Sequence, residues 1–132
     1  RDVVRDELRE LVAAGVQLVL PIAAIIETGN HIVNVGDGGA RRACAERFVA
    51  LLRATAEGRL PWVMHAVAWD DAMLHRLCEG TTATGPFLEL AAAGLLGTGD
   101  LSILVERDLY AARTAGIAVT VWTHDQRLAA FN

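Results

Sequence analysis

The sequence contains no lysine, only one serine (Ser102) and only two cysteines, Cys44 and Cys78. Because lysine is absent, all twelve basic side chains are arginines, whose planar guanidinium favours bidentate contact with phosphate or carboxylate. Ser102 does not lie in a nucleophile-elbow motif, which argues against a Ser–His–Asp hydrolase. The cysteines form neither a CxxC pair nor a dense framework, so we expect free thiols in a cytoplasmic protein.

Long apolar runs and an excess of positive charge are also absent. The longest apolar stretch, residues 16–26, is interrupted by Gln17 and Pro21 and is too short to span a bilayer. Sixteen acidic residues against twelve basic ones give a net charge of −4, which excludes a protein that coats nucleic acid through bulk charge. With 132 residues and a hydrophobic share of 53%, the chain has enough apolar surface for one folded domain.

Helical and strand-like patterns alternate along the chain. Apolar periodicity predicts helices over residues 2–14, 22–33, 40–57, 70–79, 87–96, 100–115 and 125–131. Short apolar, β-branched runs predict strands over 16–20, 61–67 and 117–123, of which the last is the clearest. This alternation predicts a single α/β domain over residues 1–132, with a mostly parallel central sheet flanked by helices.

Three acidic residues fall near the expected carboxyl ends of the strands, where open parallel sheets bind ligands. Glu27 lies in the helix after the first strand, Asp100 opens the helix that leads into the last strand, and Asp125 follows that strand. Three converging carboxylates repel one another unless a cation lies between them. Oxygen ligands of this kind suit Mg²⁺ or Mn²⁺, so we expect a metal site.

Each acid also has a purely structural interpretation. Asp100 follows Gly99 and could be the N-cap of its helix. Residues 123–126 match the capping-box pattern Thr-x-x-Gln, with Thr123 as the cap and Asp125 as a favourable first-turn acid. Glu27 could occupy a solvated helix face, and Asn30, three residues on, shares that face.

Three short blocks resemble, in the same order, the later three blocks of a PIN domain. They are Leu20-Pro-x5-Glu27-x-x-Asn30, Gly99-Asp100-Leu-Ser-Ile and Val121-Trp-Thr-His-Asp125-x-x-Leu128. The resemblance spans residues 11–132, although no motif is recognisable over 34–97. The family begins with a central strand that carries its first aspartate, and nothing in this chain matches that strand. We therefore expect a PIN-like domain truncated at its N-terminus.

The resemblance implies a three-layer sandwich and a Mg²⁺- or Mn²⁺-dependent endoribonuclease, similar to the toxins of bacterial toxin–antitoxin pairs. It further implies RNA as the substrate, and an antitoxin and a second copy of the chain as partners. Glu27, Asp100 and Asp125 match three of the family's four metal-binding acids, while Asn30 and Thr123 match supporting polar positions. Asp108, 17 residues before Asp125, is a rival to Asp100.

Residues 36–60 carry a net charge of +2 inside an acidic chain, since they hold five arginines against three acids. Arg41, Arg42 and Arg47 could contact an RNA backbone, or they could form an ordinary solvated helix face. Two further hypotheses remain open at this point. The chain could be a catalytically degenerate PIN-like domain that binds RNA or protein, or an unrelated α/β domain whose three acids only cap helices.

Overall fold

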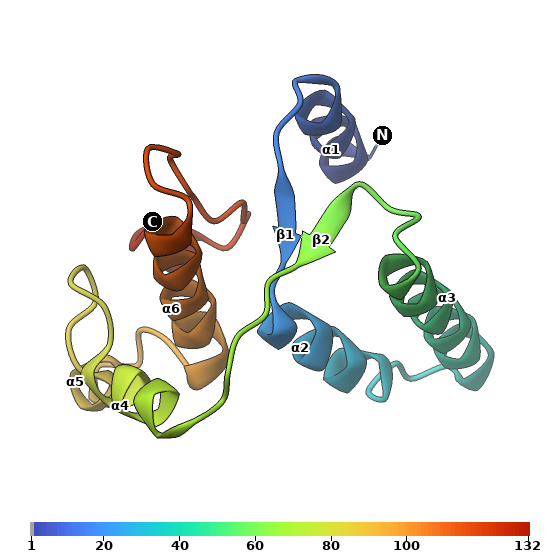
Figure 1. Cartoon of the computed structure of the whole chain (residues 1–132). Helices are drawn as coiled ribbons and strands as arrows, with labels where there is room; N and C mark the ends of the chain where they lie inside the picture. Colours follow the sequence, from blue (N-terminus) through green and yellow to red (C-terminus); the bar gives the residue numbers. More distant parts are fainter. Residues whose placement is uncertain (1) are drawn as a thin grey trace. The chain divides into compact units, whose positions relative to one another are not determined.

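The structure, a computed structural model, describes residues 2–132 and consists of helices with a short parallel sheet (Figure 1). Its elements are α1 (Val3–Ala13), β1 (Leu18–Leu20), α2 (Ile22–Ile32), α3 (Gly38–Ala56), β2 (Trp62–Met64), α4 (Asp71–Glu79), α5 (Phe87–Ala92), α6 (Thr98–Arg113) and α7 (Gln126–Ala129). The chain divides into two compact units. The first runs up to Leu20 and resumes over Thr28–Met64, and the second comprises Pro21–Glu27 and His65–Asn132.

The first unit is organised around the pairing of β1 with β2. The two strands are parallel, with Leu18 opposite Trp62 and Leu20 opposite Met64. The Trp62 indole N–H donates a hydrogen bond of 3.0 Å to Thr55 Oγ1, which connects β2 to α3. Ala54 is the one buried residue among those that the structure describes in this unit, so its apolar core is small.

The hydrophobic core lies in the second unit and surrounds α6. Leu101 and Leu104 on this helix are both 0% exposed, and Val105 adds to the same face. Burial of a leucine side chain contributes about 1.5–3 kcal/mol, so this face supplies much of the unit's stability. The remaining members of the core cluster come from α4, α5, the loop before α6, and α7: Met73, Leu90, Leu96 and Leu128.

The broad expectation of a mixed α/β fold is confirmed, and helices form near all the predicted positions. The strand predicted over 117–123 is wrong, because in the described chain this segment pairs with no other strand. The side chain of Asn132 takes the place of a partner at Val121: its Oδ1 accepts from the Val121 N–H at 2.8 Å, and its Nδ2 donates to the Val121 carbonyl at 2.7 Å. Within residues 2–132, the sheet therefore consists of β1 and β2 alone.

A buried carboxylate attaches the start of α2 to α6. Glu106 is 7% exposed, and its carboxylate accepts a hydrogen bond from the backbone N–H of Ile22, in the first turn of α2. The first N–H groups of a helix have no partner within the helix, so Glu106 satisfies one of them. No hydrogen-bond partner is found for its Oε1 among the described residues. Glu106 thus fixes the first turn of α2 on the buried helix, five residues before Glu27.

Burial raises the pKa of Glu106, although the Ile22 hydrogen bond opposes the shift. A carboxyl whose pKa is higher in the folded state favours folding while it is protonated, and this contribution is lost as the pH rises through the folded pKa. We expect the wild type to lose stability relative to Glu106→Gln as the pH rises from about 4 to 8. Urea unfolding followed by circular dichroism at several pH values measures the difference, and parallel stability curves for the two proteins would contradict it.

Candidate metal centre

Glu27, on α2, lies directly against the first turn of α6. Its carboxylate occupies the space beside Gly99 so closely that a Cβ atom at position 99 would collide with Glu27 Oε1. Glycine is therefore required at this position for steric reasons while Glu27 keeps its place. Glu27 is the one acid of α2, and this contact places its carboxylate at the start of α6.

Asp100 follows Gly99 in the first turn of α6 and is partly buried. The N-cap of this helix is Gly97, so the interpretation of Asp100 as the N-cap is wrong. Burial raises the pKa of Asp100 above its ordinary value, and the negative charge of Asp125 raises it further. The two carboxylates therefore interact electrostatically, although 25 residues separate them in the sequence.

Asp125 is the N-cap of α7. Its Oδ1 accepts hydrogen bonds from the backbone N–H groups of Arg127 at 2.8 Å and Leu128 at 3.3 Å. The capping box with Thr123 as the cap is therefore wrong by two residues. Thr123 instead accepts a hydrogen bond from the Asp125 N–H at 3.0 Å through its Oγ1, and so helps to orient the turn that presents Asp125.

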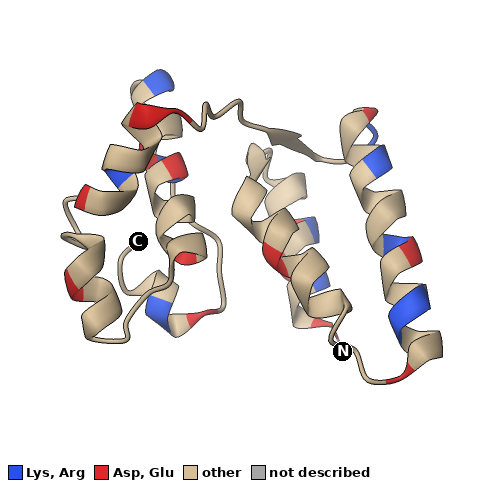
Figure 2. Cartoon of the chain, turned by 90° about the horizontal axis from the view of Figure 1, so that it is seen from below, with Lys and Arg blue, Asp and Glu red and all other residues tan. Residues whose placement is uncertain are grey.

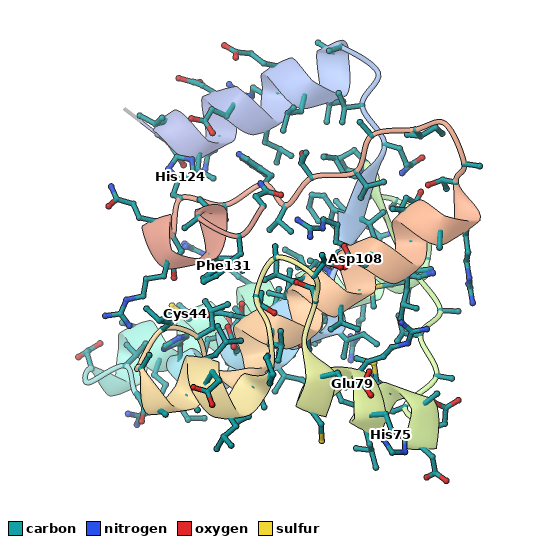
Figure 3. The ribbon with its side chains drawn as sticks, turned by 90° about the vertical axis from the view of Figure 1, so that its left-hand side faces the viewer. Cys44, His75, Glu79, Asp108, His124 and Phe131 are labelled. Carbon is teal, nitrogen blue, oxygen red and sulfur yellow. The ribbon has the colours of Figure 1, made fainter. Side chains whose placement is uncertain are left out.

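Asp108 and Asn30 have other surroundings. Asp108, which is labelled in Figure 3, lies on α6 two turns beyond Asp100. It forms an ion pair of 3.0 Å with Arg107. Asp125 raises the pKa of Asp100, whereas Asp108 already has a cationic partner, which makes Asp100 the better candidate of the two. Asn30 is exposed, belongs to the first unit, and accepts a hydrogen bond from the Asn34 side chain through its carbonyl. Its supporting role stays a prediction.

The donor chemistry of Glu27, Asp100 and Asp125 fits a hard divalent cation, because all three offer carboxylate oxygens. A cation would relieve the repulsion between Asp100 and Asp125. The Glu27 carboxylate, which lies against Gly99, would be a third ligand. Over residues 2–132, however, no three His, Cys, Asp or Glu side chains are grouped closely enough to hold a metal ion. Metal binding would therefore require side-chain rearrangement that brings these carboxylates together.

The three arginines predicted to contact RNA are all exposed on α3. Figure 2 shows several basic positions along this helix. Arg42 forms an ion pair of 2.9 Å with Glu46, one turn further along the helix. Arg41 donates a hydrogen bond of 2.9 Å to the carbonyl of Val35 and so closes the loop before α3. Glu46 is the one acid within α3 against four arginines, so the helix itself carries a net charge of +3, and Asp37 and Glu57 flank its two ends.

In comparisons with known proteins, no family model, curated protein or solved structure matched this chain. None of the helices formed by the described residues is long and apolar enough to cross a membrane.

Gly99→Ala tests whether the position of the Glu27 carboxylate beside Gly99 is needed for metal binding. The added Cβ displaces a flexible carboxylate, while alanine favours the helix, so we expect stability to change by no more than about 1 kcal/mol. Mn²⁺ affinity, measured by titration calorimetry, should fall by about tenfold or more, as it does when outer-shell partners of metal ligands are altered. Gly36→Ala is the control because no atom lies within 4 Å of its Cβ position and the residue belongs to the first unit. Equal affinities in the two variants would contradict a role for this position.

Proposed function

We propose that this chain is a PIN-like, Mg²⁺- or Mn²⁺-dependent endoribonuclease that hydrolyses RNA phosphodiester bonds. Two observations in one compact unit support it most: the Glu27 carboxylate lies against Gly99, the neighbour of Asp100, and the charge of Asp125 raises the pKa of Asp100. These are the acids that the resemblance to PIN domains assigns to metal binding. Glu27 is exposed, as a solvated helix face predicts, but its carboxylate also lies against Gly99, and the N-cap of α6 is Gly97 and not Asp100.

In this proposal Glu27, Asp100 and Asp125 hold the ion. A bound Mg²⁺ supplies a water of lowered pKa and offsets the charge that develops on the phosphodiester oxygens. The contribution of the chain is to position the three carboxylates. The Oδ1 atom of Asp125 accepts hydrogen bonds from backbone N–H groups of α7, which fixes the side chain. Its Oδ2 atom would remain available as a metal ligand. Glu106 fixes the first turn of α2, the helix that carries Glu27.

The finer parts of the proposal rest on the resemblance. They are a three-layer sandwich, a cytoplasmic toxin that pairs with an antitoxin, and a homodimer. Arg41, Arg42 and Arg47 would contact the RNA backbone, for which arginine is well suited. Because two of these arginines already have local partners, RNA phosphates would compete with Glu46 and with the Val35 carbonyl.

Asp125→Asn separates the charge of Asp125 from its role as a cap. Asparagine caps helices about as well as aspartate, so α7 should remain intact. We expect RNA cleavage in Mn²⁺ that is abolished by EDTA and lowered by about a hundredfold or more in this variant. Gel assays on end-labelled RNA measure the rates.

The matched control is Asp2→Asn, because Asp2 caps α1 in the same way and takes no part in the candidate centre. Its cleavage rate should equal that of the wild type. Cleavage that persists in EDTA and in Asp125→Asn would exclude the proposal. RNA binding without any cleavage would favour the degenerate binding module instead.

A further inference from the structure

A pocket of about 200 Å³ lies at the C-terminal end of α6, within the second unit. Its walls come from three segments, namely residues 65–70, α4 and the last turns of α6. Met73 and Leu109 provide apolar lining, whereas Arg76 and Arg113 bring positive charge. The acids of the candidate metal centre lie at the opposite end of the same helix, so the pocket is a separate feature.

The two arginines have unused hydrogen-bonding capacity. Arg113 donates one long hydrogen bond, 3.5 Å from its Nη1 to the carbonyl of Ala66. Neither Arg76 nor Arg113 forms an ion pair with an acidic side chain among residues 2–132. Asp70 is the one acid that lines the pocket, and its Oδ1 accepts the Met73 N–H at the start of α4. With two arginines against one aspartate, the lining has a net positive charge.

His65 also lines the pocket and is only 8% exposed. Its ring meets the edge of the Tyr110 ring, with centroids 5.1 Å apart, but neither Nδ1 nor Nε2 has a hydrogen-bond partner among the described residues. Buried polar atoms are normally hydrogen-bonded, so two unpaired nitrogens on one ring indicate a missing partner. Burial and, secondarily, the charge of Arg113 lower the pKa of His65, which leaves a neutral imidazole with one N–H to donate.

We propose that this pocket binds a phosphoryl group, with Arg76 and Arg113 as charged donors and His65 as a neutral donor. Donors from three separate segments suit the three terminal oxygens of a phosphoryl group, and guanidinium groups form strong, charge-assisted bonds to such oxygens. The volume suits a small group better than a drug-sized ligand, whose pockets are about 300–1,000 Å³.

Inorganic phosphate, titrated into the full chain in EDTA and followed by NMR of the arginine and histidine side chains, tests the pocket. We expect saturable shifts of Arg76, Arg113 and His65, and about tenfold or more weaker binding in Arg76→Gln and Arg113→Gln. Arg53→Gln, which removes the same charge from α3, should bind as the wild type does. Equal weakening in all three variants, no saturation, or acetate binding as tightly as phosphate would overturn the proposal.

His65→Phe provides an independent variant. It keeps an aromatic ring against Tyr110 but removes both unpaired nitrogens, so phosphate binding should weaken while the melting temperature stays the same or rises. His75→Phe is its control, because His75 is exposed on α4 and does not line the pocket (Figure 3). A loss of stability in His65→Phe together with unchanged phosphate affinity would mean that His65 is only part of the core.

The same titration identifies the source of the phosphoryl group. If a short RNA displaces inorganic phosphate from Arg76 and Arg113, the pocket binds a backbone phosphate. If RNA leaves the bound phosphate in place, the pocket binds a free phosphate compound. Because EDTA prevents metal-dependent cleavage, these results do not depend on the ribonuclease proposal.

Discussion

Burial of α6 is the constraint on which the second unit depends. Leu101 and Leu104 are fully enclosed by residues from α4, α5 and α7, so this helix has a fixed position within its unit. Both candidate sites use its polar positions. Asp100 lies in the first turn and Arg113 at the last residue, and each sign of charge is the one that the helix dipole favours at that end. A single buried helix thus supports an acidic centre at one end and a basic pocket at the other.

The contacts between α2 and α6 involve two carboxylates, and that of Glu106 has a positioning role. Glu106 bonds to the N–H of Ile22, and Glu27 rests against Gly99, so two contacts hold the first turns of α2 along the buried helix. Glu106 is buried with one oxygen unpaired, which is costly for stability.

The sequence predicted the local structure well because most helices have clear periodicity and good caps. Asp37 and Asp70, for example, begin α3 and α4 by accepting hydrogen bonds from the backbone.

The prediction of a strand over 117–123 is wrong for a different reason. The alternation is real, since Val119, Val121 and Thr123 are half-buried, but a strand also requires a partner, which no local pattern reveals. The order of the motifs predicts that Asp100 and Asp125 belong to one site. It does not predict which acid caps a helix, because capping depends on the backbone geometry at the helix start.

The residues that the sequence did not reveal are those whose environment is tertiary. A charged residue such as Glu106 is expected at the surface from the sequence alone. In the structure it is buried, and its carboxylate accepts a hydrogen bond from Ile22 of α2. His65, Arg76 and Arg113 are separated by up to 48 residues, and no spacing rule connects them. Gly99 stood out only as part of a motif, and the structure adds the reason for glycine, which is the carboxylate beside it.

Paramagnetic broadening by Mn²⁺ tests the central claim most directly, because it locates the ion without requiring activity. In the NMR spectrum of the full chain, substoichiometric Mn²⁺ should broaden the backbone amides of Glu27, Gly99, Asp100 and Asp125 first. The broadening should disappear when Asp100 and Asp125 are both replaced by asparagine. Broadening that is centred elsewhere, or that persists unchanged in the double variant, would contradict a metal centre at the start of α6.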